Sequence, residues 1–381
     1  MEIVSIAQSK SYKQEEVEKA VYDCLDGIPG IKSRIKNGAR VLVKVNLLKK
    51  NAPEDAVTTH PAVVEAIVRY LQGLGCRVII GDSPGGPYNV KRLISIYKAS
   101  GMTQVAENTG CELNYDTSAV DIVNEKAQKL KQMQIIKVAE DVDFIVSAAK
   151  FKTHGMMLYT GAVKNLFGVI PGLTKAEYHF KMNNAENFAH HLVDICEYIK
   201  PVFTIIDAIE GMEGDGPSAG EKRQVGLILA SENPYALDTA GAHIMGIQPL
   251  QVPTVKIAKE RGIFGGELKD LSVKGLQLED IHIPPFKLPG SLGKSLVSGK
   301  VPKFVEEFLI NALRAQPVFN YDSCISCGEC ARGCPAKIID MSSGKPKLDL
   351  NKCISCFCCH ELCPKKAVDI KKHWLHKLLF R

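Results

Sequence analysis

Residues 324–364 read CISCGECARGCPAKIIDMSSGKPKLDLNKCISCFCCHELCP, and nine of the thirteen cysteines of this 381-residue chain lie in this stretch. Eight of them form two copies of one pattern, in which Cys-x2-Cys-x2-Cys is followed by x3-Cys-Pro. This is the bacterial-type spacing for two [4Fe–4S] clusters, in which the last cysteine of each copy binds the cluster of the other copy. The spacing therefore predicts one cluster held by Cys324, Cys327, Cys330 and Cys363, and a second held by Cys353, Cys356, Cys359 and Cys334.

These cysteines do not suit a zinc site or a set of disulfides. Zinc sites typically pair two short Cys-x2-Cys arms, and disulfides need an oxidising compartment, whereas nothing in the sequence suggests export. From about residue 317 to residue 370 the chain resembles the bacterial two-cluster ferredoxins, which implies electron transfer with a redox partner protein. The extra thiol of Cys358 is expected to be a small packing residue, with a spare cluster ligand as the alternative.

The rest of the sequence is long enough to bury a large core. About 300 residues remain beside the cluster-binding domain, and 45% of the chain is apolar. Strands are predicted at 2–7, 40–48, 78–81, 143–149, 202–207 and 225–230, and a less definite strand pair near residue 112 and at 134–139. Helices are predicted at 14–25, 62–74, 90–100, 185–199 and 235–245.

This alternation predicts an α/β domain over residues 1–283, with a mostly parallel sheet and helices on both faces. A small α+β ferredoxin-like domain follows at 317–370. Residues 284–316 are predicted to be a linker that ends in a short amphipathic helix, Phe304–Leu313. Residues 371–381 form a basic amphipathic tail, which either packs on the large domain or contacts a partner or an anionic membrane.

The charge distribution argues against general nucleic-acid binding. The net charge is +6, but residues 365–381 carry five of these charges, and each cluster adds about two negative charges in its oxidised form. Nucleic-acid binding requires a broad basic face, and a nearly neutral protein with a basic tail does not provide one. No apolar run approaches the ~20 residues that cross a bilayer, so we expect a cytoplasmic protein without a transmembrane segment.

Polar residues follow several predicted strands, where sheets of this class bind their ligands. These clusters are Lys44 and Asn46, residues 82–86 (DSPGG), residues 150–155 (KFKTHG) with 161–165 (GAVKN), and residues 207–217 (DAIEGMEGDGP). Lys150, Lys152, Lys164 and Lys175 would repel one another unless an anion lies among them. A carboxylate or phosphate group would satisfy them, and the alternative is four solvated lysines on a surface loop.

The stretches KFKTHGMMLYTGAVKNLFGVIPG, IIDAIEGMEGDGPSAG and VIIGDSPGG resemble the domain-of-unknown-function 362 family over about residues 30–260. Members of that family often carry a ferredoxin-like extension, and the resemblance assigns no reaction. It implies that the polar signature of the family consists here of Lys152, His154, Lys164, Asn165, Lys175, His179, Asp207, Glu210, Gly214 and Gly216.

Histidines and the acidic glycine-rich loop leave alternatives open. His154 and His179 could move protons near neutral pH or bind a metal, although a lone histidine is more often a hydrogen-bonded structural residue. In the loop, Gly214 and Gly216 could let backbone amides approach a phosphate, with Asn165, Asp207 and Glu210 as further cofactor-binding candidates. Its carboxylates would repel that phosphate unless a divalent cation intervened. The alternative is a flexible turn.

Two functions follow from these expectations. In the first, the protein is an iron–sulfur oxidoreductase: the clusters deliver electrons to an anionic small-molecule substrate held near Lys152 and Lys164, and His154 or His179 donates protons. In the second, the protein is a ferredoxin-like electron carrier, whose large domain is a docking or regulatory module without catalysis. Side chains scattered on separate surfaces would contradict the first function, and substrate-dependent oxidation of the reduced clusters would rule out the second.

Overall fold

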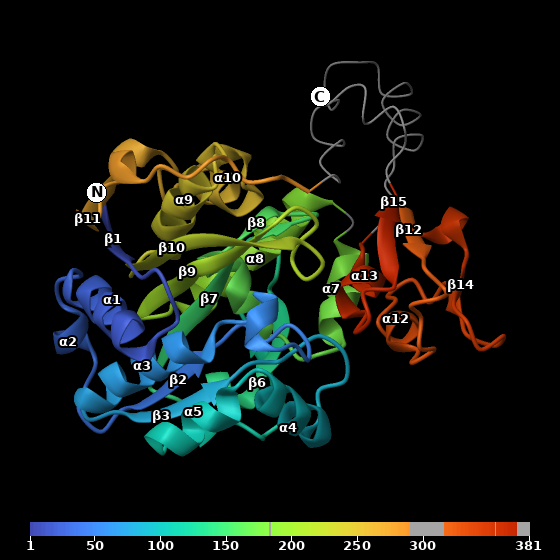
Figure 1. Cartoon of the computed structure of the whole chain (residues 1–381), viewed down its shortest axis with the longest axis horizontal. Helices are drawn as coiled ribbons and strands as arrows, with labels where there is room; N and C mark the ends of the chain where they lie inside the picture. Colours follow the sequence, from blue (N-terminus) through green and yellow to red (C-terminus); the bar gives the residue numbers. More distant parts are fainter. Residues whose placement is uncertain (183, 290–315, 355, 372–381) are drawn as a thin grey trace.

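The computed structural model describes residues 1–182, 184–289, 316–354 and 356–371, apart from the side chains of residues 176 and 179–181. The predicted helix Phe304–Leu313 and tail residues 372–381 lie outside this part of the chain. Figure 1 shows a large α/β domain with a smaller domain beside it, formed by the last described residues.

A single large sheet runs through the α/β domain. Its strands follow the order β11 (Leu271–Gly275), β1 (Glu2–Gln8), β10 (Glu221–Ser231), β9 (Phe203–Glu213), β7 (Phe144–His154), β2 (Arg40–Lys44), β3 (Arg77–Gly81) and β4 (Glu112–Leu113). β10 is antiparallel to both neighbours, and β8 (Leu158–Thr160) is antiparallel to β7. The other neighbouring strands are parallel, so the predicted mostly parallel sheet is confirmed.

Helices cover both faces of this sheet, because its strands alternate apolar side chains between two cores. In β2, Val41 and Val43 belong to one core and Leu42 to the other. The first core includes side chains of α1 (Gln14–Asp26), α2 (Ile31–Arg34), α3 (Pro61–Gly73), α4 (Val90–Ala99) and α5 (Met102–Thr109). The second includes side chains of α6 (Ala162–Asn165), α7 (Thr174–Lys181), α8 (Ala185–Ile199), α9 (Pro234–Ile244) and α10 (Pro253–Glu260).

Most predicted elements occur within about two residues of their expected bounds, and the differences involve polar residues. β7 and β9 extend to residues 154 and 213, so part of the expected acidic loop is a strand that pairs with β10. Conversely, β2 ends at Lys44, where the expected strand continued to residue 48. β6 (Gln132–Ile136) pairs with β5 (Ala119–Val123) in a separate hairpin and not with β4, which corrects the expected strand pair.

The small domain is α+β, as predicted. β12 (Gln316–Phe319) pairs with β15 (Val368–Lys371), and β13 (Ile339–Asp340) pairs with β14 (Lys347–Leu348). Each cysteine motif contributes one short helix, α12 (Glu329–Arg332) or α13 (Cys358–Leu362). The small apolar core of this domain contains three of the predicted cluster ligands, Cys330, Cys359 and Cys363.

Candidate functional site

Lys44, at the end of β2, forms a buried ion pair at the carboxyl end of the sheet. Its side chain is 1% exposed, and its Nζ lies 2.8 Å from Oδ1 of Asp82, which follows β3. The same nitrogen donates to Oδ1 of Asn165 at 3.1 Å. A methyl group on Gly168 would lie closer than 3.0 Å to both members of the ion pair, so the chain needs glycine there.

Lys152 lies one step further along the same network. Its Nζ donates to Oδ1 of Asn46 at 2.8 Å and to the carbonyl of Val57 at 2.7 Å, and Asn46 Nδ2 in turn donates to Asn165 at 3.2 Å. Burial, reinforced by the nearby charge of Lys164, holds the pKa of Lys152 well below its usual value. The hydrogen-bond acceptors of Lys152 are therefore neutral oxygens and not carboxylates.

Lys164, in α6, is a cation without a hydrogen-bonding partner for its ammonium group among the described residues. Its Nζ lies 5.9 Å from the ring centre of Phe167, and burial lowers its pKa. The charge that opposes this lowering most strongly is the carboxylate of Glu361. Lys152, Lys164 and Asn165, which the sequence singles out together, therefore lie in one network of hydrogen bonds and charges. Glu361 also belongs to this network, which the sequence did not predict.

Lys175, in α7, completes the group of lysines at this edge of the sheet. Its Nζ donates to the carbonyl of Ser83, and the hydroxyl of Ser83 accepts a hydrogen bond from the amide of Gly172 at 2.8 Å. Burial lowers the pKa of Lys175 to about 7, against 10.5 for an ordinary lysine. Near neutral pH this side chain is close to its midpoint of protonation.

The lowered pKa of Lys175 predicts a pH-dependent stability. Between pH about 7 and 10.5 the unfolded chain binds a proton at this lysine that the folded chain does not, so the free energy of unfolding should rise with pH. Lys175→Met removes the titrating group and should make this rise less steep. Urea unfolding of both proteins at pH 7, 8 and 9 measures the difference, and parallel curves would contradict the prediction.

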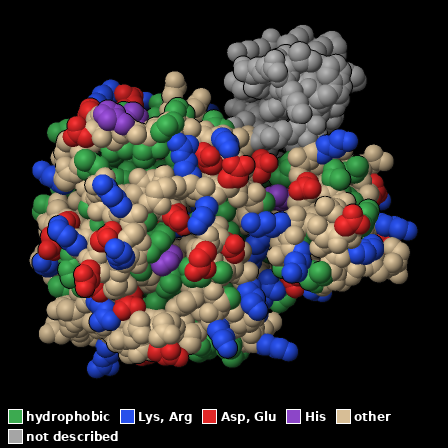
Figure 2. Space-filling model, viewed as in Figure 1, with side chains coloured by type: hydrophobic (Ala, Val, Ile, Leu, Met, Phe, Trp, Pro, Cys, Tyr) green, Lys and Arg blue, Asp and Glu red, His purple; other side chains and the backbone are tan. Residues whose placement is uncertain are grey.

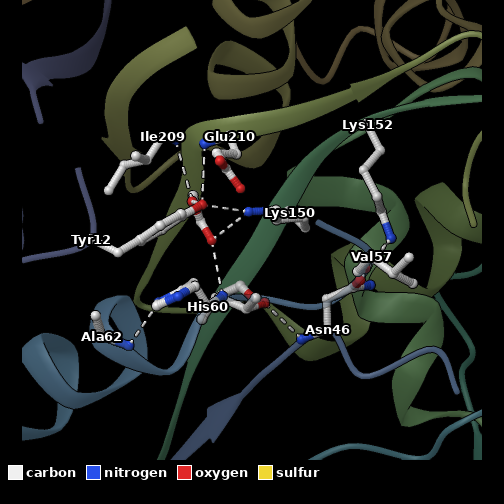
Figure 3. A network of polar contacts seen from close by, with 12 residues as sticks. Tyr12, Asn46, Val57, His60, Ala62, Lys150, Lys152, Ile209 and Glu210 are labelled. Atoms are coloured by element: carbon white, nitrogen blue, oxygen red, sulfur yellow. Dashed lines mark hydrogen bonds and ion pairs between the residues drawn. The ribbon is translucent and has the colours of Figure 1, made fainter. Parts of the chain in front are cut away.

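Lys150 and Asp207 form a second buried ion pair, whose side chains are 1% and 0% exposed and whose atoms lie 2.8 Å apart. The hydroxyl of Tyr12 accepts from Lys150 at 2.8 Å and donates to Asp207 at 3.0 Å, as Figure 3 shows for Tyr12 and Lys150. Asp207 also accepts from the backbone amide of His60, whose ring stacks on Tyr12 with ring centres 3.6 Å apart. This network connects Tyr12, in the loop between β1 and α1, to the ends of β7 and β9.

Of the two candidate histidines, His154 is buried beside the small domain and His179 belongs to α7. His154, at the end of β7, is 2% exposed, and its Nδ1 accepts hydrogen bonds from the amides of Met156 and Met157. These bonds place the proton of the neutral ring on Nε2, which lies 3.5 Å from Oε1 of Glu361. His179 falls in α7, and its side chain is outside the described part of the chain.

Two acidic residues of the stretch 207–217, Glu210 and Glu213, are paired with cations. Glu210 lies 3.2 Å from Lys222, and Glu213 lies 2.7 Å from Arg223. Gly214 has a positive φ of 75°, and Gly216 is packed against the backbone of Thr153. Among the described residues no group of three His, Cys, Asp or Glu side chains is arranged to hold a single metal ion.

The cysteines of the small domain are grouped as their spacing predicts. Cys324, Cys327, Cys330 and Cys363 line one cavity together. Burial raises the pKa of Cys359, and the neighbouring thiols of Cys356, Cys353 and Cys334 raise it further. The residues therefore fit two clusters with exchanged fourth ligands. Cys358, the extra thiol, is 6% exposed in the core of the domain.

The small domain packs on the large one through α13. Lys49 donates to the carbonyl of Cys363 at 3.0 Å, and the hydroxyl of Ser218 donates to the carbonyl of Glu361 at 3.3 Å. A second contact joins Arg92 to Glu329 of the first motif at 3.1 Å. Figure 2 shows Lys and Arg side chains along the boundary between the two domains. The cluster-binding domain thus covers the lysines at the strand ends.

Comparisons with known proteins agree with this architecture. A family model described as "Domain of unknown function (DUF362)" matches residues 41–243, which is more than half of the chain. The chain belongs to the DUF362 family. A second model, described as a 4Fe-4S dicluster domain, matches residues 316–364, so this DUF362 protein carries a ferredoxin-type iron–sulfur domain. Both expected resemblances are confirmed.

A relative of this DUF362 protein is the thylakoid-associated protein sll1697 of Synechocystis sp., 32% identical over 322 residues, which cover 80% of this chain and 96% of the relative. Two solved structures are more distant. The lactate racemase apoprotein from Thermoanaerobacterium thermosaccharolyticum has a TM-score of 0.42 at 12% identity, covering 64% of this chain and 57% of its own. A Thermotoga maritima protein has a TM-score of 0.34 at 11% identity, covering 58% and 56%.

The DUF362 protein shows no helix, within its described residues, with the length and apolar character that a membrane span requires. Sequence reasoning missed three residues of the site, namely Tyr12, Lys49 and Glu361. The signal for Glu361 was present, because it stands between two predicted cluster ligands. Nothing in the sequence connected Tyr12 or Lys49 to the strand ends.

Proposed function

We propose that this DUF362 protein is an iron–sulfur oxidoreductase that reduces a small anionic substrate at the carboxyl ends of β2 and β7. The proposed cofactors are two [4Fe–4S] clusters with the exchanged ligand sets given above. One observation carries the proposal: Glu361 belongs to α13, the helix that contains Cys359 and ends beside Cys363, and its carboxyl lies 3.5 Å from Nε2 of His154. The charges of Lys164 and Lys152 act on the same carboxyl. Had these side chains lain on separate surfaces, the proposal would have no support.

The charge balance at this edge of the sheet favours an anionic substrate. Five lysines gather there around two carboxylates, those of Asp82 and Glu361; the lysines are Lys44, Lys49, Lys152, Lys164 and Lys175. Lys44 is neutralised by its ion pair with Asp82. Lys152 and Lys164 remain as the donors that a carboxylate or phosphate group would engage.

The remaining side chains supply position and protons. His154 holds a proton on Nε2 at the edge of the site, and Asn165 and Asn46 keep Lys44 and Lys152 in place through hydrogen bonds. When bound, the clusters supply reversible one-electron transfer within the domain that covers the site. Two electrons from a reduced redox partner protein, with two protons from solvent, balance a two-electron reduction of the substrate.

Anaerobic reoxidation of the reduced protein tests this function. Pools of carboxylated and phosphorylated metabolites are added while the visible absorption of the clusters is followed. We expect one pool to reoxidise the protein, and Lys164→Ala or Lys152→Ala to slow this at least about tenfold, because each removes a hydrogen-bond donor to the substrate. Lys222→Ala, which changes an exposed lysine elsewhere, is the matched control and should react like the wild type.

An absence of reoxidation by any pool, with fast electron exchange with a partner redox protein, would instead support the second function, an electron carrier with a non-catalytic large domain. Equal reoxidation of the wild type and both lysine variants would place the reaction elsewhere in the molecule.

A further inference from the structure

The two cysteine motifs are copies of one pattern, but they differ in the residue two positions after the third cysteine. In the first motif this residue is Arg332, which is 51% exposed and pairs with Glu329 of its own motif at 2.7 Å. In the second motif it is Glu361, which is 15% exposed and faces the large domain. At this position the second motif therefore presents a carboxylate to the large domain, whereas the first motif has an exposed arginine.

Packing and hydrogen bonds on either side hold Glu361 in this place. Its backbone carbonyl accepts from Ser218, and the next residue, Leu362, packs so closely on Gly85 that a methyl group at that glycine would lie 2.9 Å from it. Lys49 binds the carbonyl of Cys363 on the following residue. The side chain of Glu361 is thus inserted among the lysines by three contacts that do not involve its own charge.

The carboxylate of Glu361 adds a negative charge beside Lys164, Lys49 and Lys152. The hydrogen bonds of Lys152 go to the neutral oxygens of Asn46 and Val57, and the described residues give Lys164 no hydrogen-bonding partner. Burial raises the pKa of Glu361, and the nearby charges of Lys164, Lys49 and Lys152 oppose this rise. Buried cations without a counter-charge are costly, so an anion near these lysines stabilises the arrangement in which α13 lies against the strand ends.

We propose that Glu361 is an internal ligand of the anion site, occupying the position of the oxyanion of the substrate. A small molecule with a carboxylate or phosphate group displaces this side chain and separates α13 from the lysines. This inference rests on the proposed function, because it takes Lys152 and Lys164 as the anion-binding residues. It adds that the substrate competes with the protein's own carboxylate, so the cluster-binding domain acts as the cover of the site.

Competition of this kind has a measurable size. The apparent affinity of a ligand is reduced by the fraction of protein in the state able to bind it, so a site closed about nine-tenths of the time binds about tenfold more weakly. Glu361→Gln keeps the size of the side chain and removes its charge. We expect this variant of the cluster-loaded full-length protein to bind inorganic phosphate or acetate at least about tenfold more tightly than the wild type.

Calorimetric titration with inorganic phosphate and, separately, with acetate measures the two affinities and shows which oxyanion the site prefers. Arg332→Gln is the matched control, because it changes the equivalent residue of the first motif, and it should bind both anions like the wild type. Equal affinities of the wild type and Glu361→Gln, or no binding of either anion to both proteins, would overturn the proposal.

A second measurement uses the wild type alone and decides the question if Glu361→Gln fails to incorporate its clusters. Hydrogen exchange of residues 358–363 is followed with and without saturating phosphate or acetate. Displacement predicts faster exchange of this helix, whose amides include those of His360 and Glu361 bonded to the carbonyl of Phe357. Unchanged exchange on binding would overturn the opening of α13. The reoxidation test is independent, since anions can displace Glu361 without being reduced.

Discussion

Cys334→Ala is expected to abolish the cluster of the second motif, although Cys334 belongs to the first. The exchanged assignment places it with Cys353, Cys356 and Cys359, and a [4Fe–4S] cluster that loses one of four thiolates is no longer fully held. The anaerobically reconstituted variant should contain about half of the wild-type iron and inorganic sulfide. Chemical analysis and the electron paramagnetic resonance spectrum of the reduced protein measure both.

Double variants test the exchange of ligands directly. Cys334→Ala combined with Cys353→Ala should lose no more iron than either single change, because both changes affect one cluster. Cys334→Ala combined with Cys324→Ala should lose the iron of both clusters. Cys358→Ala is the control, since this buried thiol is not assigned to either cluster and its replacement should leave the iron content unchanged. The reverse pattern in the two double variants would show that each motif keeps its own fourth cysteine.

Asp207→Ala is expected to lower the free energy of unfolding by about 3–5 kcal/mol, because it leaves the buried ammonium group of Lys150 without its counter-charge. It also removes the acceptor for the hydroxyl of Tyr12 and for the amide of His60. Urea unfolding followed by far-ultraviolet circular dichroism measures the change.

Glu210→Ala is the matched control for Asp207→Ala. It lies three residues away in the same strand, but its partner Lys222 is 52% exposed, and ion pairs at the surface contribute about 0–1 kcal/mol. We therefore expect a small effect. Equal losses of stability in the two variants would mean that the Lys150 and Asp207 pair contributes no more than a surface pair.

The positions of the strands could be predicted largely from apolar residues, and their ends could not. The apolar run before Lys150 predicted a strand that stops near residue 149, yet β7 continues through Lys150 and Lys152 to His154. These lysines are buried because Asp207, Asn46 and Val57 supply partners from distant parts of the chain. A sequence does not reveal such partners, and the charged residues alone therefore predict an end to the strand.

The candidate site was predicted in part. Lys152, His154, Lys164 and Asn165 could be singled out because they follow predicted strands, and they do lie together. The separate network of Asp207 could not be foreseen, because its carboxylate binds Tyr12, Lys150 and the backbone amide of His60, which are distant in the sequence. Glu361 was missed because the ligand pattern of its motif drew attention to the cysteines, and its role depends on packing between two domains.

The contact between α13 and the strand ends has a kinetic consequence. Two separate proteins must meet by diffusion before electrons can pass, so their rate depends on concentration and on ionic strength. Under the proposed function, donor and acceptor sites share one polypeptide, and the tether replaces that encounter with an effective local concentration in about the millimolar range. Transfer from the clusters to the lysine site should therefore be first order in protein and insensitive to dilution, while the step that fills the clusters remains bimolecular.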